Sequence, residues 1–219
     1  MTRKLIYTII IAALLLVPAC NFDQIASFYG NYPQESGSLL FQDAFSDPAS
    51  GWDRVRTPEG MTDYDGDQYR ILVNSPNADY WANPGLNFTD VLVEVQVRKI
   101  NGPDDNNFGI LCRYQNLDNF YFLIISSDGY YGIGKVKDGK QTLIEPEQMY
   151  PSPVIAQGNQ QNHLRAVCQG SKLALFVNGE LVAETDDQSF LEGDVGLIVG
   201  TFEQPGVDVV FDNLVVKVP

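Results

Sequence analysis

Three strand-like segments between residues 108 and 135 constrain the fold of this chain more than any other feature. Residues 108–114 alternate in character, which predicts Cys112 on an inward face and Arg113 on the opposite face. Residues 120–125 are apolar at every position, which favours a strand covered on both faces. Turn-forming residues separate the segments. The stretch therefore predicts a β-meander in the middle of a sheet.

Short alternating segments continue through most of the chain and no long helical periodicity interrupts them. Val91 to Ile100 alternates cleanly, with valines on one face and polar residues on the other. Asp138-Gly139 and Asn178-Gly179 are typical of tight hairpins. Residues 145–161 contain three prolines and are expected to be the least regular part. The pattern predicts an all-β, two-layer antiparallel sandwich.

The amino-terminal residues have the build of a secretory signal. Arg3 and Lys4 precede an apolar run over residues 5–17, which is short for a transmembrane helix, and Cys20 follows soon after. The end of the run resembles a bacterial lipobox, which implies that Cys20 is lipidated and anchors the chain to a membrane outside the cytoplasm. An ordinary signal peptide with a coincidental cysteine is the alternative. We expect a signal peptide over 1–19, a lipidated tether over 20–38 and one domain over 39–219.

The chain is acidic, with 14 Lys and Arg against 28 Asp and Glu and a net charge of −14. Nucleic acids are bound largely through cationic side chains that meet phosphates, so this balance argues against a nucleic-acid partner. It equally argues against a polybasic membrane contact.

Cys112 and Cys168 each alternate in phase with apolar neighbours, so both are expected to face the core. In an oxidising compartment such a pair favours a disulfide. Two buried free thiols are the alternative. A bridge closing so long a loop would contribute about 3–5 kcal/mol.

Several motifs together resemble the concanavalin A-like lectin/glucanase jelly roll. They are Asp43-Ala44-Phe45, Gly51-Trp52, Phe108-Gly109-Ile110 with Arg113, Phe176-Val177-Asn178-Gly179, Gly193-Asp194-Val195-Gly196-Leu197 and Phe211-Asp212-Asn213. The nearest branch by resemblance is bacterial surface lipoproteins related to the 3-keto-disaccharide hydrolase and laminin G groups. The resemblance implies two curved sheets with carbohydrate bound on the concave face or at loop ends.

A catalytic set is not evident. Glucanases of this superfamily carry paired acids on one strand, whereas Glu94 here is followed by Gln96 where a second acid is needed. Glu94 is more readily explained as an exposed residue or a partner of Arg98. His163 is the only histidine and has no evident catalytic partner. Asn107-Phe108-Gly109-Ile110 also departs from the hydrolase branch, so we nominate no catalytic residue.

Aromatic residues are the best candidates for ligand binding, because sugars stack their C–H faces on aromatic rings. Glu94, Arg98 and Arg113 could bind the sugar hydroxyl groups. The rings are Tyr80, Trp81, Tyr114, Tyr121, Tyr130 and Tyr131. The alternative for each ring is that it fills the core.

The resemblance also raises a structural calcium ion held by Asp43 and Asp212, because the first and last strands are often neighbours in this fold. The acidic turn over residues 63–67 is better explained as a hairpin, and no other cofactor is expected. Three functions follow as hypotheses: a non-catalytic carbohydrate-binding domain, a hydrolase of the 3-keto-disaccharide type, and a surface module that contacts another protein.

Overall fold

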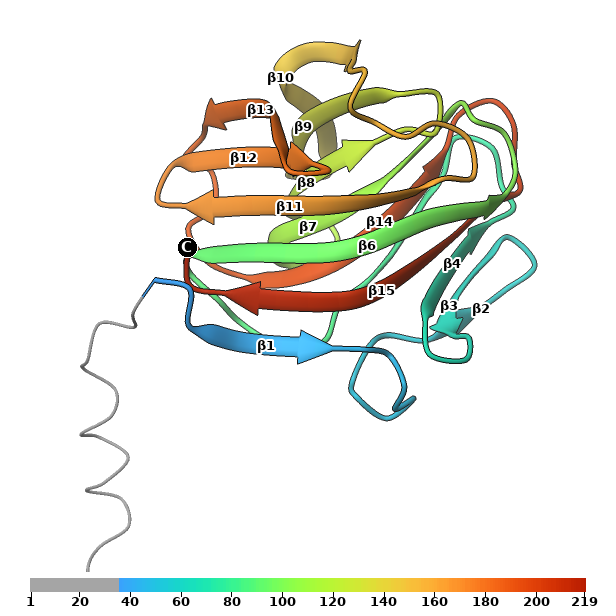
Figure 1. Ribbon diagram of the computed structural model, residues 1–219, viewed down its shortest axis with the longest axis horizontal. Helices are drawn as coiled ribbons and strands as arrows, with labels where there is room; N and C mark the ends of the chain where they lie inside the picture. Colours follow the sequence, from blue (N-terminus) through green and yellow to red (C-terminus); the bar gives the residue numbers. More distant parts are fainter. Residues whose placement is uncertain (1–35) are drawn as a thin grey trace, which may run out of the picture. The chain divides into compact units, whose positions relative to one another are not determined.

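The computed structural model describes residues 36–219, except for the side chain of residue 145, and expectations about residues 1–35, including Cys20, lie outside that range. The described part is built from β-strands and turns, without helices, in two antiparallel sheets (Figure 1). It accordingly contains no helical segment with the length and hydropathy of a membrane span. The all-β, two-layer prediction is confirmed.

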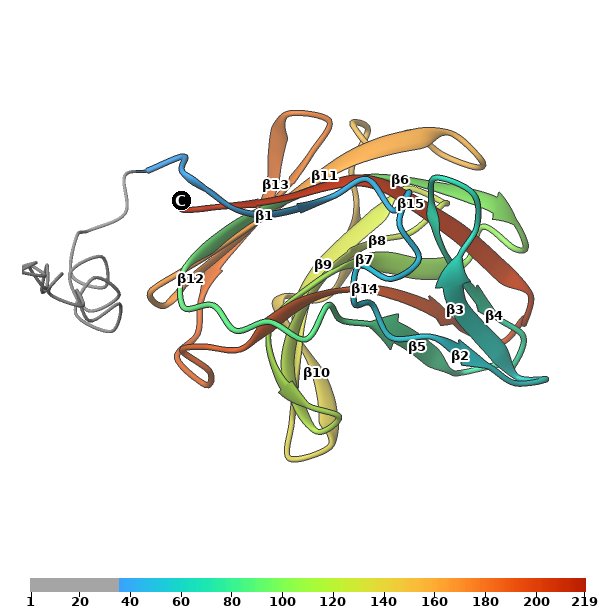
Figure 2. The ribbon, with the colours of Figure 1, turned by 90° about the horizontal axis from the view of Figure 1, so that it is seen from below.

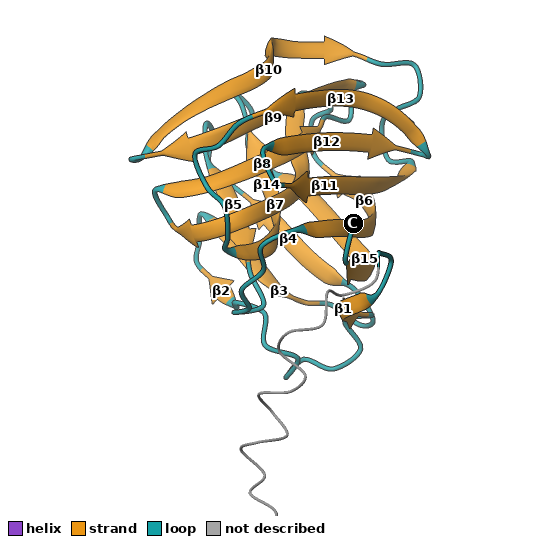
Figure 3. Ribbon diagram, turned by 90° about the vertical axis from the view of Figure 1, so that its left-hand side faces the viewer, coloured by secondary structure: helices purple, strands orange, loops and turns teal. Residues whose placement is uncertain are grey.

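The first sheet follows the order β13-β12-β11-β6-β15-β4-β3-β2, and β1 pairs with the second half of β15. Figure 3 shows its strands layered against those of the second sheet. Its strands are β1 (Leu39–Asp43), β2 (Val55–Arg56), β3 (Gly60–Tyr64), β4 (Tyr69–Val73), β6 (Val91–Asn101), β11 (Gln161–Gln169), β12 (Lys172–Val177), β13 (Glu180–Asp186) and β15 (Val207–Lys217).

The second sheet has the order β10-β9-β8-β7-β14-β5, so the predicted meander forms its centre. Its strands are β5 (Asp79–Ala82), β7 (Asn106–Asn116), β8 (Asn119–Ile125), β9 (Tyr130–Lys137), β10 (Lys140–Pro151) and β14 (Asp194–Thr201). In Figure 2 strand β10 lies in the lower part of the view.

The main core lies between the two sheets and takes alternate residues from each strand. On β6 the four valines 91, 93, 95 and 97 are buried, as the alternation predicts. From β8 the main core takes Tyr121, Leu123 and Ile125. All of its members lie between residues 45 and 216, so residues 36–219 contain a complete core of their own.

A second apolar cluster covers the other face of the second sheet, away from the main core. Phe120, Phe122 and Ile124 belong to it, together with Leu111, Val136 and Ile198, and these six side chains are between 0 and 8% exposed. Strand β8 is therefore buried on both faces, which confirms the expectation from its continuous apolar sequence.

The two predicted hairpins form with the backbone that their sequences favour. Asp138 and Gly139 have φ of 52° and 75°, and Asn178 and Gly179 have φ of 52° and 94°. Both central residues of a type I′ turn need positive φ, which Asn, Asp and Gly adopt most readily.

Two local expectations need correction. Residues 145–161 are expected to be the least regular part, and residues 152–160 do lie outside the strands, but β10 continues to Pro151 by shifting its register with β9 twice. Arg113 was expected to face away from Cys112, but it has a φ of 53° and its side chain is buried. The register of β7 with β8 shifts just after Cys112, and such a bulge redirects a side chain that simple alternation would place outside.

Candidate functional site

The outer face of the second sheet carries an aligned polar pair between β5 and β7. Asp79 and Asn107 lie opposite the same residue, Gly200, on the strand between them. A Cβ at position 200 would collide with the Asp79 carboxylate and the Asn107 amide. The absence of a side chain at Gly200 therefore lets the two polar groups meet across β14.

The second sheet is curved so strongly that side chains from its two edge strands line the same cavity. Gln141 lies on edge strand β10, Asp79 lies on the opposite edge strand β5, and both line one cavity. Burial raises the pKa of Asp79 above its usual range, and hydrogen bonds from the side-chain amides of Asn107 and Gln141 oppose that rise. The outer face is thus concave, and Asp79, Asn107 and Gln141 converge on it from three strands.

Two cavities of about 300 Å³ and about 160 Å³ flank this polar group. Both are lined by Asp79, Trp81 and Leu117, so they form one two-lobed depression, which we call the Trp81 depression. The ring centroid of Trp81 lies 5.3 Å from that of Phe120, and the ring centroid of Tyr114 lies 5.6 Å from that of Phe120. Trp81 and Tyr114, both half-buried, are the predicted aromatics that the structure brings together here.

The other predicted aromatics are dispersed. Tyr80 lines the larger lobe but packs partly against the main core, and its hydroxyl lies 3.2 Å from the hydroxyl of Thr57. Tyr131 also packs against the main core. Tyr121 is fully buried and donates to Asp187, and burial raises its pKa to about 12. Tyr130, which is 38% exposed, lines a separate cavity of about 470 Å³.

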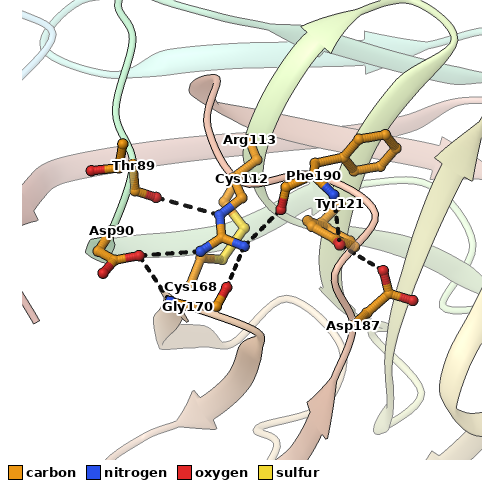
Figure 4. The surroundings of a disulfide bond; sticks show 9 residues. All are labelled: Thr89, Asp90, Cys112, Arg113, Tyr121, Cys168, Gly170, Asp187 and Phe190. Carbon is orange, nitrogen blue, oxygen red and sulfur yellow. Dashed lines mark hydrogen bonds and ion pairs between the residues drawn. A yellow bond between two sulfur atoms is a disulfide. The ribbon is translucent and has the colours of Figure 1, made fainter.

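Arg113, which the sequence suggested for ligand binding, has a side chain that is only 1% exposed, and its guanidinium is engaged inside the molecule. It donates to the carbonyl oxygens of Gly170 and Phe190 at 2.7 and 2.8 Å and to that of Thr89 at 3.3 Å. Nη2 also lies 3.3 Å from a carboxylate oxygen of Asp90. Figure 4 shows these contacts around one guanidinium.

Cys112, which precedes Arg113 in the sequence, and Cys168 form the predicted disulfide. Cys112 on β7 and Cys168 on β11 are bonded, with their Cα atoms 6.8 Å apart (Figure 4). Because β7 and β11 belong to different sheets, the bond joins the two layers through the main core.

Glu94 and Arg98 lie on β6 of the first sheet, so they do not meet Trp81 and Tyr114 on the second. The carboxylate of Glu94 pairs with Arg165 and Lys217, each at 3.0 Å, rather than with Arg98. Burial alone would raise the pKa of Glu94, but the bonds from Lys217 and Arg165 lower it below its usual range. Glu94 is therefore an ionised partner in an ion-pair cluster and is not free to bind a ligand.

Asp43, one of the two residues proposed for calcium, is already engaged by groups of the protein. The carboxylate of Asp43 accepts bonds from the Phe45 backbone, the Ser50 hydroxyl and the Trp52 indole, so its oxygens are occupied. Within residues 36–219, no three or more His, Cys, Asp or Glu side chains gather closely enough to hold a metal ion. Asp43 instead fixes the loop that follows β1.

Sequence reasoning missed Asp79, Asn107 and Gln141. A short run of Asp79, Tyr80 and Trp81 at a strand start was a usable signal for the first of them, because the two-residue period of a strand puts Asp79 on the same face as Trp81. Nothing in the sequence places Gln141 near Asp79, since the two residues are 62 positions apart and the curvature of the whole sheet determines that contact.

Several solved structures have the same fold as this chain. The carbohydrate binding module CBM66 from Bacillus subtilis has a TM-score of 0.61 at 19% identity, over 77% of this chain and 96% of that one. A protein of unknown function with a galectin-like fold from Bacillus subtilis has a TM-score of 0.61 at 12% identity, over 84% and 97%. The β-glucanase of Bacillus licheniformis has a TM-score of 0.59 at 12% identity, over 84% and 100%. No protein-family model and no curated protein sequence matches the chain.

Proposed function

Because the chain has the concanavalin A-like jelly-roll fold, we propose that its domain binds carbohydrate, without catalysis, in the Trp81 depression. The observation that carries the proposal is the combination of two half-buried aromatic rings, Trp81 and Tyr114, with the carboxylate of Asp79 in one concave depression. Aromatic faces hold the C–H face of a sugar ring, and a few fixed polar groups bind its hydroxyls. Similarity to a carbohydrate binding module and a β-glucanase supports the same class of ligand.

The test is a panel of gluco-, xylo-, galacto- and fructo-oligosaccharides titrated against residues 36–219, which contain the complete core. We expect at least one series to bind, and Trp81→Ala to weaken that binding by about tenfold or more, because the stacking surface is lost. Tyr130→Ala removes a ring from the separate cavity and serves as the matched control. Binding that depends on Tyr130 and not on Trp81 would place the ligand elsewhere.

A hydrolase is the second candidate, because Asp53 and Asp79 line the same lobe of the depression and the pKa of Asp79 is raised. A carboxyl group whose pKa is raised is what a general acid in glycoside cleavage requires. Turnover of any of the panel sugars that disappears in Asp79→Asn would establish this candidate. Turnover absent in the unchanged protein, with binding present, supports the non-catalytic function.

Outside the described residues, we propose that Cys20 is lipidated and that the mature chain is anchored to a membrane on the extracytoplasmic side. Metabolic labelling with palmitate tests this directly. Label is expected on the unchanged chain and lost from Cys20→Ser, and label that persists in the variant would contradict the anchor.

A further inference from the structure

The concave face is not an open groove. The six side chains of the second apolar cluster cover its middle and are themselves buried. They leave no row of exposed rings along which a polysaccharide could lie. Two spaces border the covered middle: the Trp81 depression, and the separate cavity of about 470 Å³ beside Tyr130, Leu143 and Met149.

Strand β10, at the edge of the second sheet opposite to β5, covers part of this face. Leu143 and Met149 pack on the apolar cluster from the arch of β10. Glycines on the neighbouring strand permit this: a Cβ at position 132 would lie 3.0 Å from Leu143 and 3.4 Å from Met149, and one at position 134 would collide with the Phe122 ring. The covering of the face is therefore a property of the sequence of β9 and β10.

The Trp81 depression is the space in which the proposed aromatic and polar residues meet, and its smaller lobe reaches the β9–β10 turn. Gly139 and Gln141 line that lobe together with Trp81 and Phe122. Its volume of about 160 Å³ is about half the lower limit of roughly 300 Å³ for pockets that hold drug-sized ligands. The larger lobe, lined by Tyr80 and Tyr114, opens on the other side of Trp81 and Leu117.

Resting on the proposed function, we infer that the Trp81 depression binds the end of a glycan, about two sugar units, and not an internal stretch of a polysaccharide. Trp81 lines both lobes, so it contacts the terminal unit and its neighbour. Asp79 and Gln141 bind hydroxyls of the unit in the smaller lobe, where a continuing chain would meet the β9–β10 turn.

The experiment measures affinity against length within the oligosaccharide series that the panel identifies. The disaccharide and the hexasaccharide are expected to bind within about twofold of each other, because units beyond the second make no contact. An affinity that rises by about tenfold or more from disaccharide to hexasaccharide would overturn the inference while leaving the proposed function intact. If no sugar on the panel binds, the proposed function itself is contradicted, and the inference with it.

A second measurement distinguishes chain ends from chain interiors. The matching polysaccharide is cut into a few pieces by limited hydrolysis, which multiplies its ends at constant mass. Binding capacity per gram should rise in proportion to the number of ends. A capacity that stays constant would show that internal segments are bound.

Discussion

Arg113 holds separate backbone segments together through one buried guanidinium, which contacts three carbonyl oxygens and Asp90. Arg113→Ala should lower the free energy of unfolding by about 3–5 kcal/mol, because those buried acceptors would lose their partner. Arg98→Ala, at an exposed position of the same residue type, should change it by less than about 0.5 kcal/mol. Urea denaturation of both variants measures the difference, and equal effects would show that the buried contacts contribute little.

Asp194 makes stability depend on pH. Burial raises the pKa of Asp194 to about 6, although the backbone N–H groups of Leu86, Val195 and Gly85 bind the carboxylate. A raised pKa means that the folded state holds the proton more tightly than the unfolded state. The stability from Asp194 is therefore complete below about pH 4 and is lost as the pH rises through about 6.

The measurement compares the unchanged protein with Asp194→Asn, whose amide does not titrate. Between about pH 4 and pH 7, the unchanged protein should lose about 2–3 kcal/mol of its free energy of unfolding relative to the Asp194→Asn variant. A difference that stays constant across this range would mean that Asp194 does not titrate as described.

Glu94 lies on the first sheet, where it forms ion pairs with Arg165 and Lys217. Glu94→Gln should leave saccharide affinity unchanged, because Glu94 and the Trp81 depression lie on different sheets. It should cost less than about 1 kcal/mol in stability, since the pairs with Arg165 and Lys217 are partly exposed. Loss of saccharide binding in this variant would place the ligand on the first sheet.

At the scale of the elements, the Cys112–Cys168 bond joins β7 to β11 across a sequence separation of 56 residues. Closing a loop of this length stabilises the folded state by about 4 kcal/mol in the chain-entropy description. The double variant Cys112→Ala with Cys168→Ala should therefore unfold at a clearly lower urea concentration than the oxidised protein. An unchanged midpoint would show that packing between the sheets suffices without the bond.

The elements also show what sequence reasoning can reach. The valines of β6, the continuously apolar β8 and the Asn178-Gly179 turn follow local rules, so they were predictable. The bulge at Arg113 and the register shifts of β10 were not, because each depends on what the neighbouring strand presents. Trp81 and Tyr114 were identifiable as candidates by residue type, but their meeting with Asp79 depends on the curvature of the whole sheet.

At the scale of the whole molecule, the two outer faces differ in character. The first sheet displays ion pairs such as those of Glu94 with Arg165 and Lys217. The second sheet carries an apolar cluster bordered by the Trp81 depression and by the separate cavity beside Tyr130. This asymmetry is why we assign binding to the second sheet and expect substitutions on the first to leave affinity unchanged.

The most direct test of this assignment is the accessibility of the Trp81 indole with and without saccharide. The chain has two tryptophans, and Trp52 is buried in the main core, so a soluble quencher such as acrylamide reports mainly on Trp81. We predict that a saccharide bound in the depression reduces quenching, and that Trp81→Phe abolishes the change. Unchanged quenching while calorimetry shows the saccharide bound would contradict the account.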